Sequence, residues 1–114
     1  MSNADAASLG LTVAELQAVQ AILRVVVPGS RVLAFGSRTN GKFRPYSDLD
    51  VAVFGSHPLT LRQLRVAQEA FEESTLRFRV DLCDGAVLSA EMRAIVLAGA
   101  VVVVECGNAT AASL

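Results

Sequence analysis

Hydrophobic residues recur along this chain with two periods, one typical of helices and one typical of strands. After Thr12 and again after Thr60, apolar residues return every three or four positions, and Glu15 or Gln63 follows its threonine at a distance of three residues. A threonine with Glu or Gln at that distance forms a capping box, which marks the first turn of a helix. The pattern therefore predicts two amphipathic helices, and Pro28 ends the first.

The same spacing predicts which side of each helix is buried. The expected buried residues of the first helix are Leu16, Val19, Ile22, Leu23 and Val26, and those of the second are Leu61, Leu64, Ala67 and Phe71. A third helix is expected from Ser89, which can cap it, to Gly99, which ends it. Its apolar residues are Met92, Ile95 and Val96.

Four segments have the pattern of strands. Residues 31–35, 49–54 and 100–104 are short and mostly apolar, which predicts buried strands, whereas residues 76–83 alternate between apolar and polar side chains, which predicts a half-buried strand. The order is helix, strand, strand, helix, strand, helix, strand. This order predicts an α/β (α+β) fold, in which helices pack against a small mixed sheet of about four strands.

Composition limits the chain to one domain. Its 114 residues are 53% hydrophobic and carry a formal net charge of −1. We expect the domain to span residues 9–106, between an N-terminal tail at 1–8 and a loose C-terminal tail at 107–114. Ser2-Asn3-Ala4 resembles a remnant of a recombinant expression vector.

The charge and the apolar runs also bear on location and partners. No run is long enough to span a bilayer and no leader opens the chain, so we expect a soluble cytoplasmic protein. The net charge gives no basic field that would hold a nucleic acid polymer. Cys83 and Cys106 are too few for a disulfide framework, and we expect both to be small buried side chains.

Candidate chemistry lies at the start of the second predicted strand, at Asp48-Leu49-Asp50. Side chains alternate along a strand, so Asp48 and Asp50 face the same side. Two adjacent carboxylates repel each other unless a cation lies between them, which favours a hard divalent metal. Asp81 would add a third carboxylate if its strand is the neighbour. Asp84 is a weaker alternative because it lies on the opposite side of that strand.

Gly36-Ser37 follows the first predicted strand and precedes Asp48 by a ten-residue spacer. Backbone N–H groups at a turn from strand to helix bind anions, and glycine lets a phosphate approach closely. Together with the carboxylates, this turn predicts phosphoryl-type transfer. A P-loop would begin at the same glycine, but Phe43 replaces its metal-binding Ser or Thr and Pro45 cannot lie in its helix.

The pattern Gly36-Ser37, ten residues, Asp48-x-Asp50 resembles the signature of the DNA polymerase β-like nucleotidyltransferase superfamily. The adjoining F-G-S-R and S-D-L-D-V-A-V resemble its smallest members, the minimal nucleotidyltransferases. This resemblance implies that Asp48, Asp50 and Asp81 bind two Mg²⁺ ions and are the catalytic residues. Asp81 would accept the proton of the attacking hydroxyl.

The resemblance also implies a phosphate site. Gly36, Ser37 and Arg38 would bind the triphosphate of ATP, with Lys42 and Arg44 as further candidate contacts. The chain departs from the commonest family motif, G-S-R-A-R-G, at positions 39 and 40, where threonine and asparagine stand. This change removes one cation near the phosphates.

The small members of this family commonly act as antitoxins beside a helical HEPN-domain ribonuclease toxin. The resemblance therefore implies transfer of AMP from ATP to a tyrosine hydroxyl of that toxin, within a hetero-oligomer. Two alternatives stay open. The same fold could neutralise a toxin by occlusion with little or no catalysis, or a partner subunit could complete a small-molecule nucleotidyltransferase.

Overall fold

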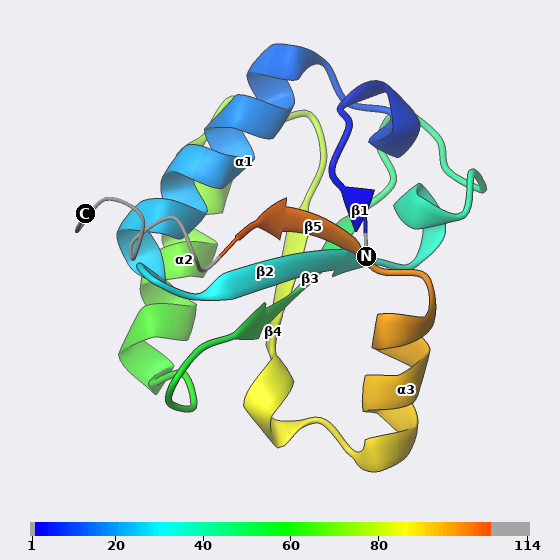
Figure 1. Cartoon of the computed structure of the whole chain (residues 1–114). Coiled ribbons are helices and arrows are strands. Elements are labelled where there is room, and N and C mark those ends of the chain that lie inside the picture. Colours follow the sequence, from blue (N-terminus) through cyan, green and yellow to red (C-terminus); the bar gives the residue numbers. More distant parts are fainter. Residues whose placement is uncertain (1, 106–114) are drawn as a thin grey trace, which may run out of the picture.

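Five strands form one mixed sheet in the computed structural model, which describes residues 2–105 (Figure 1). The strands lie in the order β1-β5-β2-β3-β4. Their bounds are β1 Ser2–Asn3, β2 Arg31–Phe35, β3 Leu49–Phe54, β4 Val80–Asp84 and β5 Val101–Val104. Strand β2 is antiparallel to both β3 and β5, whereas β3 and β4 are parallel. The predicted fold class, a small mixed sheet with helices packed against it, is confirmed.

Two helices cover one face of the sheet and a third lies on the other face (Figure 1). The first two are α1, Val13–Val26, and α2, Leu61–Glu73, and the third is α3, Ala90–Ala98. Both predicted capping boxes are present, at Thr12 and Thr60, and the Ser89 hydroxyl accepts a hydrogen bond from the Met92 N–H at 3.1 Å. Local cap chemistry thus sets where all three helices begin.

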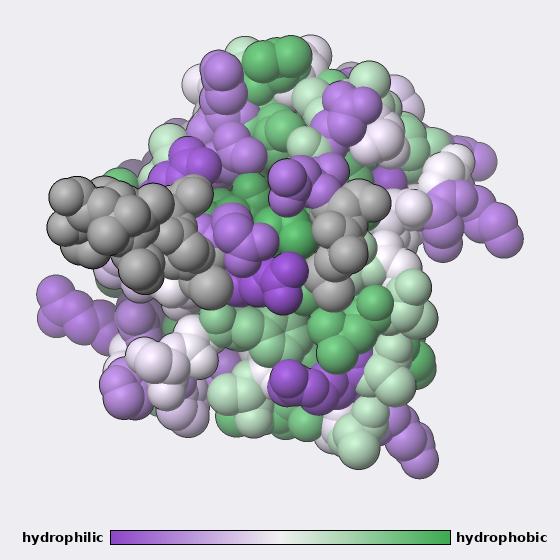
Figure 2. Space-filling model, in the orientation of Figure 1, coloured by the Kyte–Doolittle hydropathy of each residue, from purple (hydrophilic) through white to green (hydrophobic). Residues whose placement is uncertain are grey.

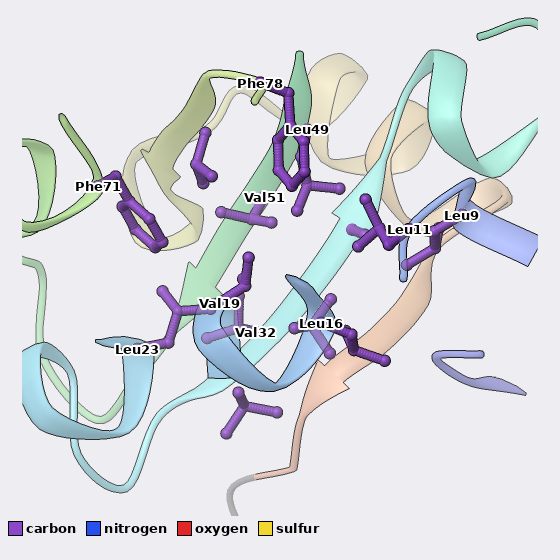
Figure 3. Packing of buried hydrophobic residues seen from close by; sticks show 14 of the residues in the cluster. Leu9, Leu11, Leu16, Val19, Leu23, Val32, Leu49, Val51, Phe71 and Phe78 are labelled. Carbon is purple, nitrogen blue, oxygen red and sulfur yellow. The ribbon is translucent and has the colours of Figure 1, made fainter. Parts of the chain in front are cut away.

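The main hydrophobic core lies between the sheet and the helices α1 and α2. Leu16, Val19 and Leu23 of α1 meet Val32 and Val51 of the sheet there (Figure 3). Leu49, Val51 and Val53 of β3 belong to this core, so Asp50 and Ala52, which alternate with them, face the other side of the sheet. That side carries the predicted carboxylates.

Three details differ from the sequence expectations. Strand β4 begins at Val80 rather than at residue 76, because β3 begins at Leu49, the residue opposite Val80, and offers no earlier partner. Leu61 is 77% exposed, because it is the first residue of α2 and lies outside the core. Met92 and Ile95 are also exposed, so α3 buries only Val96, and Figure 2 shows apolar side chains over this helix.

Residues 2–8, which the sequence analysis set aside as part of an N-terminal tail, take part in this fold. The short β1 pairs with β5, and the Ala4 N–H donates a hydrogen bond to the Val102 carbonyl at 2.6 Å. Ala6, which precedes the short 3-10 helix η1 (Ala7–Leu9), and Leu9, its last residue, are buried in the main core.

Within residues 2–105, no helix has both the length and the apolar character needed to cross a membrane. Cys106 and the predicted loose tail at 107–114 lie outside the described residues.

Candidate active site

Gly36 brings the two ends of the predicted motif together. It follows β2, where Phe35 lies opposite Asp50 of β3. Its backbone has φ +84°, a conformation that side chains disfavour, and a Cβ added there would lie 2.7 Å from the Asp50 Oδ2. Only glycine fits this position, both for its backbone and for its contact with the carboxylate. The glycine turn and the carboxylates therefore belong to one site, although thirteen residues lie between Gly36 and Asp50 in the chain.

The pairing of β3 with β4 brings the third carboxylate, that of Asp81, to the same site. In the parallel pair of β3 and β4, Asp50 lies directly opposite Asp81. Residues opposite each other in a sheet direct their side chains to the same face, so these two carboxylates are neighbours. Asp48 stands two residues before Asp50, just outside β3, and is exposed. The strand adjacency on which the expectation for Asp81 depended is thus present.

The electrostatics of Asp50 show that the three carboxylates interact. Partial burial raises the pKa of Asp50 above its ordinary value, and the negative charges of Asp81 and Asp48 raise it further. Among residues 2–105, no hydrogen-bond donor or cationic side chain pairs with any of the three carboxylates. A cationic influence comes from the buried Arg38 guanidinium, which attracts Asp48 without a salt bridge. The site therefore concentrates negative charge on oxygen ligands, which is the donor chemistry that a hard divalent cation requires.

The described residues contain no group of three His, Cys, Asp or Glu side chains in an arrangement that could hold a metal ion as it stands. Mutual repulsion keeps unpaired carboxylates apart, so their side chains would have to converge around a cation. The register of β3 and β4 places Asp50 and Asp81 on the same face of the sheet, where both side chains can turn toward one cation.

The chain matches a known family of enzymes over most of its length. Residues 16–98 match the family model described as a nucleotidyltransferase domain. The chain belongs to this family. The chain is also 43% identical over 99 residues to the probable protein adenylyltransferase MntA of Haemophilus influenzae (strain ATCC 51907 / DSM 11121 / KW20 / Rd), with 87% of each chain covered.

A solved structure described as a toxin–antitoxin with AMP-PNP has the same fold as this nucleotidyltransferase. The TM-score is 0.67 and the identity is 24%, and the match covers 78% of this chain and 72% of the other. This likeness shows the fold, and membership of the nucleotidyltransferase family implies that the substrate is a nucleotide.

The turn after Gly36 has an uncapped start. Ser37–Thr39 form the 3-10 helix η2, and no side chain caps its first residues. The Thr39 N–H and hydroxyl both donate to the Gly36 carbonyl, at 3.0 and 2.7 Å. Thr39, which departs from the commonest family motif, thus stabilises the turn. Ser37 is half-buried in this turn, and its role as a phosphate donor stays a prediction.

The structure gives Arg38 a role different from the expected phosphate contact. Its side chain is fully buried, and its guanidinium donates hydrogen bonds to the carbonyls of Leu9 at 2.8 Å, Ser47 at 2.9 Å and Pro45 at 2.9 Å. The guanidinium also lies 4.7 Å from the ring centroid of Phe78. With its donors used in this way, Arg38 holds the loop before Asp48 in place and does not face a ligand.

Sequence reasoning missed this role because the Leu9 carbonyl comes from a segment 29 residues away, and no local pattern shows that the loop carrying the Pro45 and Ser47 carbonyls folds back over Arg38. The one local signal was the combination of Arg38 with a loop rich in glycine and proline, whose carbonyls need donors. Burial lowers the pKa of Arg38, but an arginine stays protonated even so.

The remaining candidate residues, Asp84, Lys42 and Arg44, differ in their surroundings. The Asp84 carboxylate accepts hydrogen bonds from the Leu59 N–H at 2.7 Å and the Ala86 N–H at 2.9 Å, so it joins the end of β4 to the segment before α2. Asp84 therefore has a structural role, which favours Asp81 as the third carboxylate. Lys42 and Arg44 are exposed in the loop between η2 and β3, and they stay candidate phosphate contacts.

Proposed function

We propose that this nucleotidyltransferase transfers AMP from ATP to a tyrosine hydroxyl of a partner protein. The observation that carries the proposal is the meeting of Gly36, Asp50 and Asp81 at one end of three neighbouring strands. A glycine turn suited to phosphates beside unpaired carboxylates can bind a nucleotide and activate a hydroxyl. The 43% identity to a probable protein adenylyltransferase supports a protein acceptor.

The proposed reaction is a displacement at the α-phosphorus of ATP. The acceptor oxygen forms a bond to the α-phosphorus, and the bond from that phosphorus to the oxygen bridging to the β-phosphate breaks, which releases pyrophosphate. The Asp81 carboxylate accepts the hydroxyl proton. Gly36 and Ser37 orient the triphosphate through their N–H groups and the serine hydroxyl.

The carboxylates Asp48, Asp50 and Asp81 fit two Mg²⁺ ions, because they offer oxygen ligands and no salt bridge among residues 2–105 neutralises them. Bound Mg²⁺ would neutralise the charge of the phosphate oxygens and of the leaving pyrophosphate. The family relationship supports a divalent metal in the same way.

We further propose that the acceptor is a HEPN-domain ribonuclease toxin and that this protein is its antitoxin. The similar solved structure is described as a toxin–antitoxin with AMP-PNP, which supports a toxin partner and an adenine nucleotide. Modification of an essential tyrosine would silence such a ribonuclease without its degradation.

The test is transfer of label from α-labelled ATP, in the presence of Mg²⁺, to proteins of the source cell. Wild-type protein is compared with Asp50→Asn, and γ-labelled ATP serves as the control for phosphorylation. We expect one labelled band that depends on Asp50 and on the α-label. Label from γ-labelled ATP, or a band that persists with Asp50→Asn, would contradict the proposal.

An antitoxin that acts only by occlusion predicts a different result. The double variant Asp48→Asn/Asp50→Asn should still bind the toxin if the fold is intact. Under our proposal this variant binds but no longer neutralises the toxin. Neutralisation by the double variant would instead support occlusion.

A further inference from the structure

The outer edge of β4 is open in the described part of the chain. β4 is the last strand of the sheet, with β3 on one side and no strand of residues 2–105 on the other. The Leu49 N–H of β3 donates to the Arg79 carbonyl at 2.8 Å. Because backbone groups alternate in direction along a strand, Asp81 also faces β3, whereas the N–H and C=O groups of Val80 and Leu82 point outward.

A hollow of about 680 Å³ lies beside this open edge. Its walls come from α2 on one side, with Leu64, Gln68 and Phe71, and from β4 on the other, with Val80 and Leu82. Glu72 and Arg79 also line it, so the hollow combines apolar side chains with charged ones and with the unpaired backbone groups of a strand. An exposed edge of this kind pairs readily with another extended chain.

The hollow lies on the α2 side of β4, and the carboxylate site lies on the other side. Asp81 belongs to both, because it lines the hollow and stands opposite Asp50. A chain running along the edge would direct alternate side chains to the two faces. One side chain would then reach Asp81, while its two neighbours in sequence would enter the hollow.

From this arrangement we propose that an extended segment of the acceptor protein adds to the sheet as a strand along β4. The residue that carries the acceptor hydroxyl lies on the Asp81 side, and apolar residues next to it in sequence fill the hollow against α2. This inference rests on the proposed function, since it assigns a position to that reaction's protein substrate. It also predicts an acceptor sequence in which the hydroxyl residue has apolar neighbours on both sides.

The first test fills the hollow without touching the carboxylates. Gln68→Trp places a large side chain in it from α2, and Glu69→Trp, on the exposed neighbouring residue outside the hollow, is the matched control. The substrates are α-labelled ATP and the purified acceptor protein found by labelling. We expect Gln68→Trp to lower kcat/KM for the acceptor about tenfold or more, mostly through KM, and to leave ATP affinity unchanged. Glu69→Trp should behave as wild type.

The second test needs no variant. Amide hydrogen exchange, read by NMR on the wild-type protein with and without the acceptor protein, reports which N–H groups become bonded. Protection of Val80 and Leu82, with little change at Asp81, is the expected result. Protection confined to α3, around the exposed Ile95, would overturn the proposal in favour of docking on that helix.

These outcomes separate the inference from the proposed function. Wild-type protein that labels no protein contradicts the proposed function, and the position assigned to its acceptor fails with it. Wild-type transfer that Gln68→Trp leaves unchanged, without protection of Val80 and Leu82, overturns only the strand addition.

Discussion

Replacing Asp50 by asparagine should stabilise this protein at neutral pH while it abolishes activity. The wild-type carboxylate is half-buried beside Asp81 and Asp48, and its pKa is raised. A carboxyl group with a raised pKa favours the folded state below its unfolded pKa, and that stability is lost as pH rises through the folded pKa. Asparagine has nearly the same shape and no charge, so it removes the repulsion and the burial of charge that destabilise the folded protein at neutral pH.

The distance between strands sets the size of the repulsion between the Asp50 and Asp81 carboxylates. Neighbouring strands lie roughly 4.8 Å apart, so carboxylates opposite each other are separated by roughly 5 Å. At that distance two charges repel by about 3 kcal/mol with a dielectric constant of about 20, and by about 1 kcal/mol in water. Because Asp50 is only half-buried, we expect Asp50→Asn to gain about 1–2 kcal/mol, or about 3–6 °C in melting temperature.

The assay is thermal unfolding without divalent cations, across the pH range from 4 to 8 (roughly from the ordinary carboxyl pKa upward). The gain should be small at the acid end and grow as pH rises through the raised pKa of Asp50. Addition of Mg²⁺ and a non-hydrolysable ATP analogue should stabilise wild type and leave Asp50→Asn unchanged. The matched control is Asp84→Asn, which should lose about 1–2 kcal/mol because one of two backbone N–H groups loses its acceptor.

Destabilisation of the metal-free protein by Asp50→Asn, or an effect on stability that does not change with pH, would contradict this prediction. Equal stabilisation of both proteins by Mg²⁺ and nucleotide would show that the cation binds elsewhere.

Three further predictions test other parts of the structure. Arg38→Met should lower the free energy of unfolding by about 3 kcal/mol or more in urea titrations, because several buried carbonyls lose their donor; a loss below about 1 kcal/mol would refute its structural role. Gly36→Ala should weaken binding of an ATP analogue, measured by calorimetry, because alanine is strained at φ +84° and its methyl group would lie too close to the Asp50 carboxylate. Binding with wild-type affinity would contradict this prediction. Hydrogen bonds from Arg77 lower the pKa of Glu15, so stability from this pair is present above the ordinary carboxyl pKa and is lost as pH falls through the folded value. Arg77→Met should therefore reduce the pH dependence of acid unfolding, and an unchanged acid transition would argue against the pair.

The sequence predicts those features that depend on neighbouring residues. The capping boxes at Thr12 and Thr60 involve residues three apart, and both helices begin where expected. The meeting of Asp50 and Asp81 is less local, but strand alternation and strand order constrain it strongly.

Other features depend on contacts between distant segments. Arg38 appears as a surface cation in the motif, yet it is buried because carbonyls of Leu9 and the loop before Asp48 surround it. The pairing of β1 with β5 required a partner a hundred residues away, which no local pattern indicates. The exposure of Ile95 could not be predicted either. An apolar residue on a helix suggests that it is buried, but the sequence does not show which part of the protein would cover it.

The central claim is that the glycine turn and the carboxylates form one metal and nucleotide site. The most direct measurement is binding of Mn²⁺, in place of Mg²⁺, followed by electron paramagnetic resonance with a non-hydrolysable ATP analogue present. We expect wild type and Asp84→Asn to bind Mn²⁺ in a nucleotide-dependent manner, and Asp50→Asn and Asp81→Asn to lose this binding. Mn²⁺ binding that survives both of these substitutions would contradict the claim.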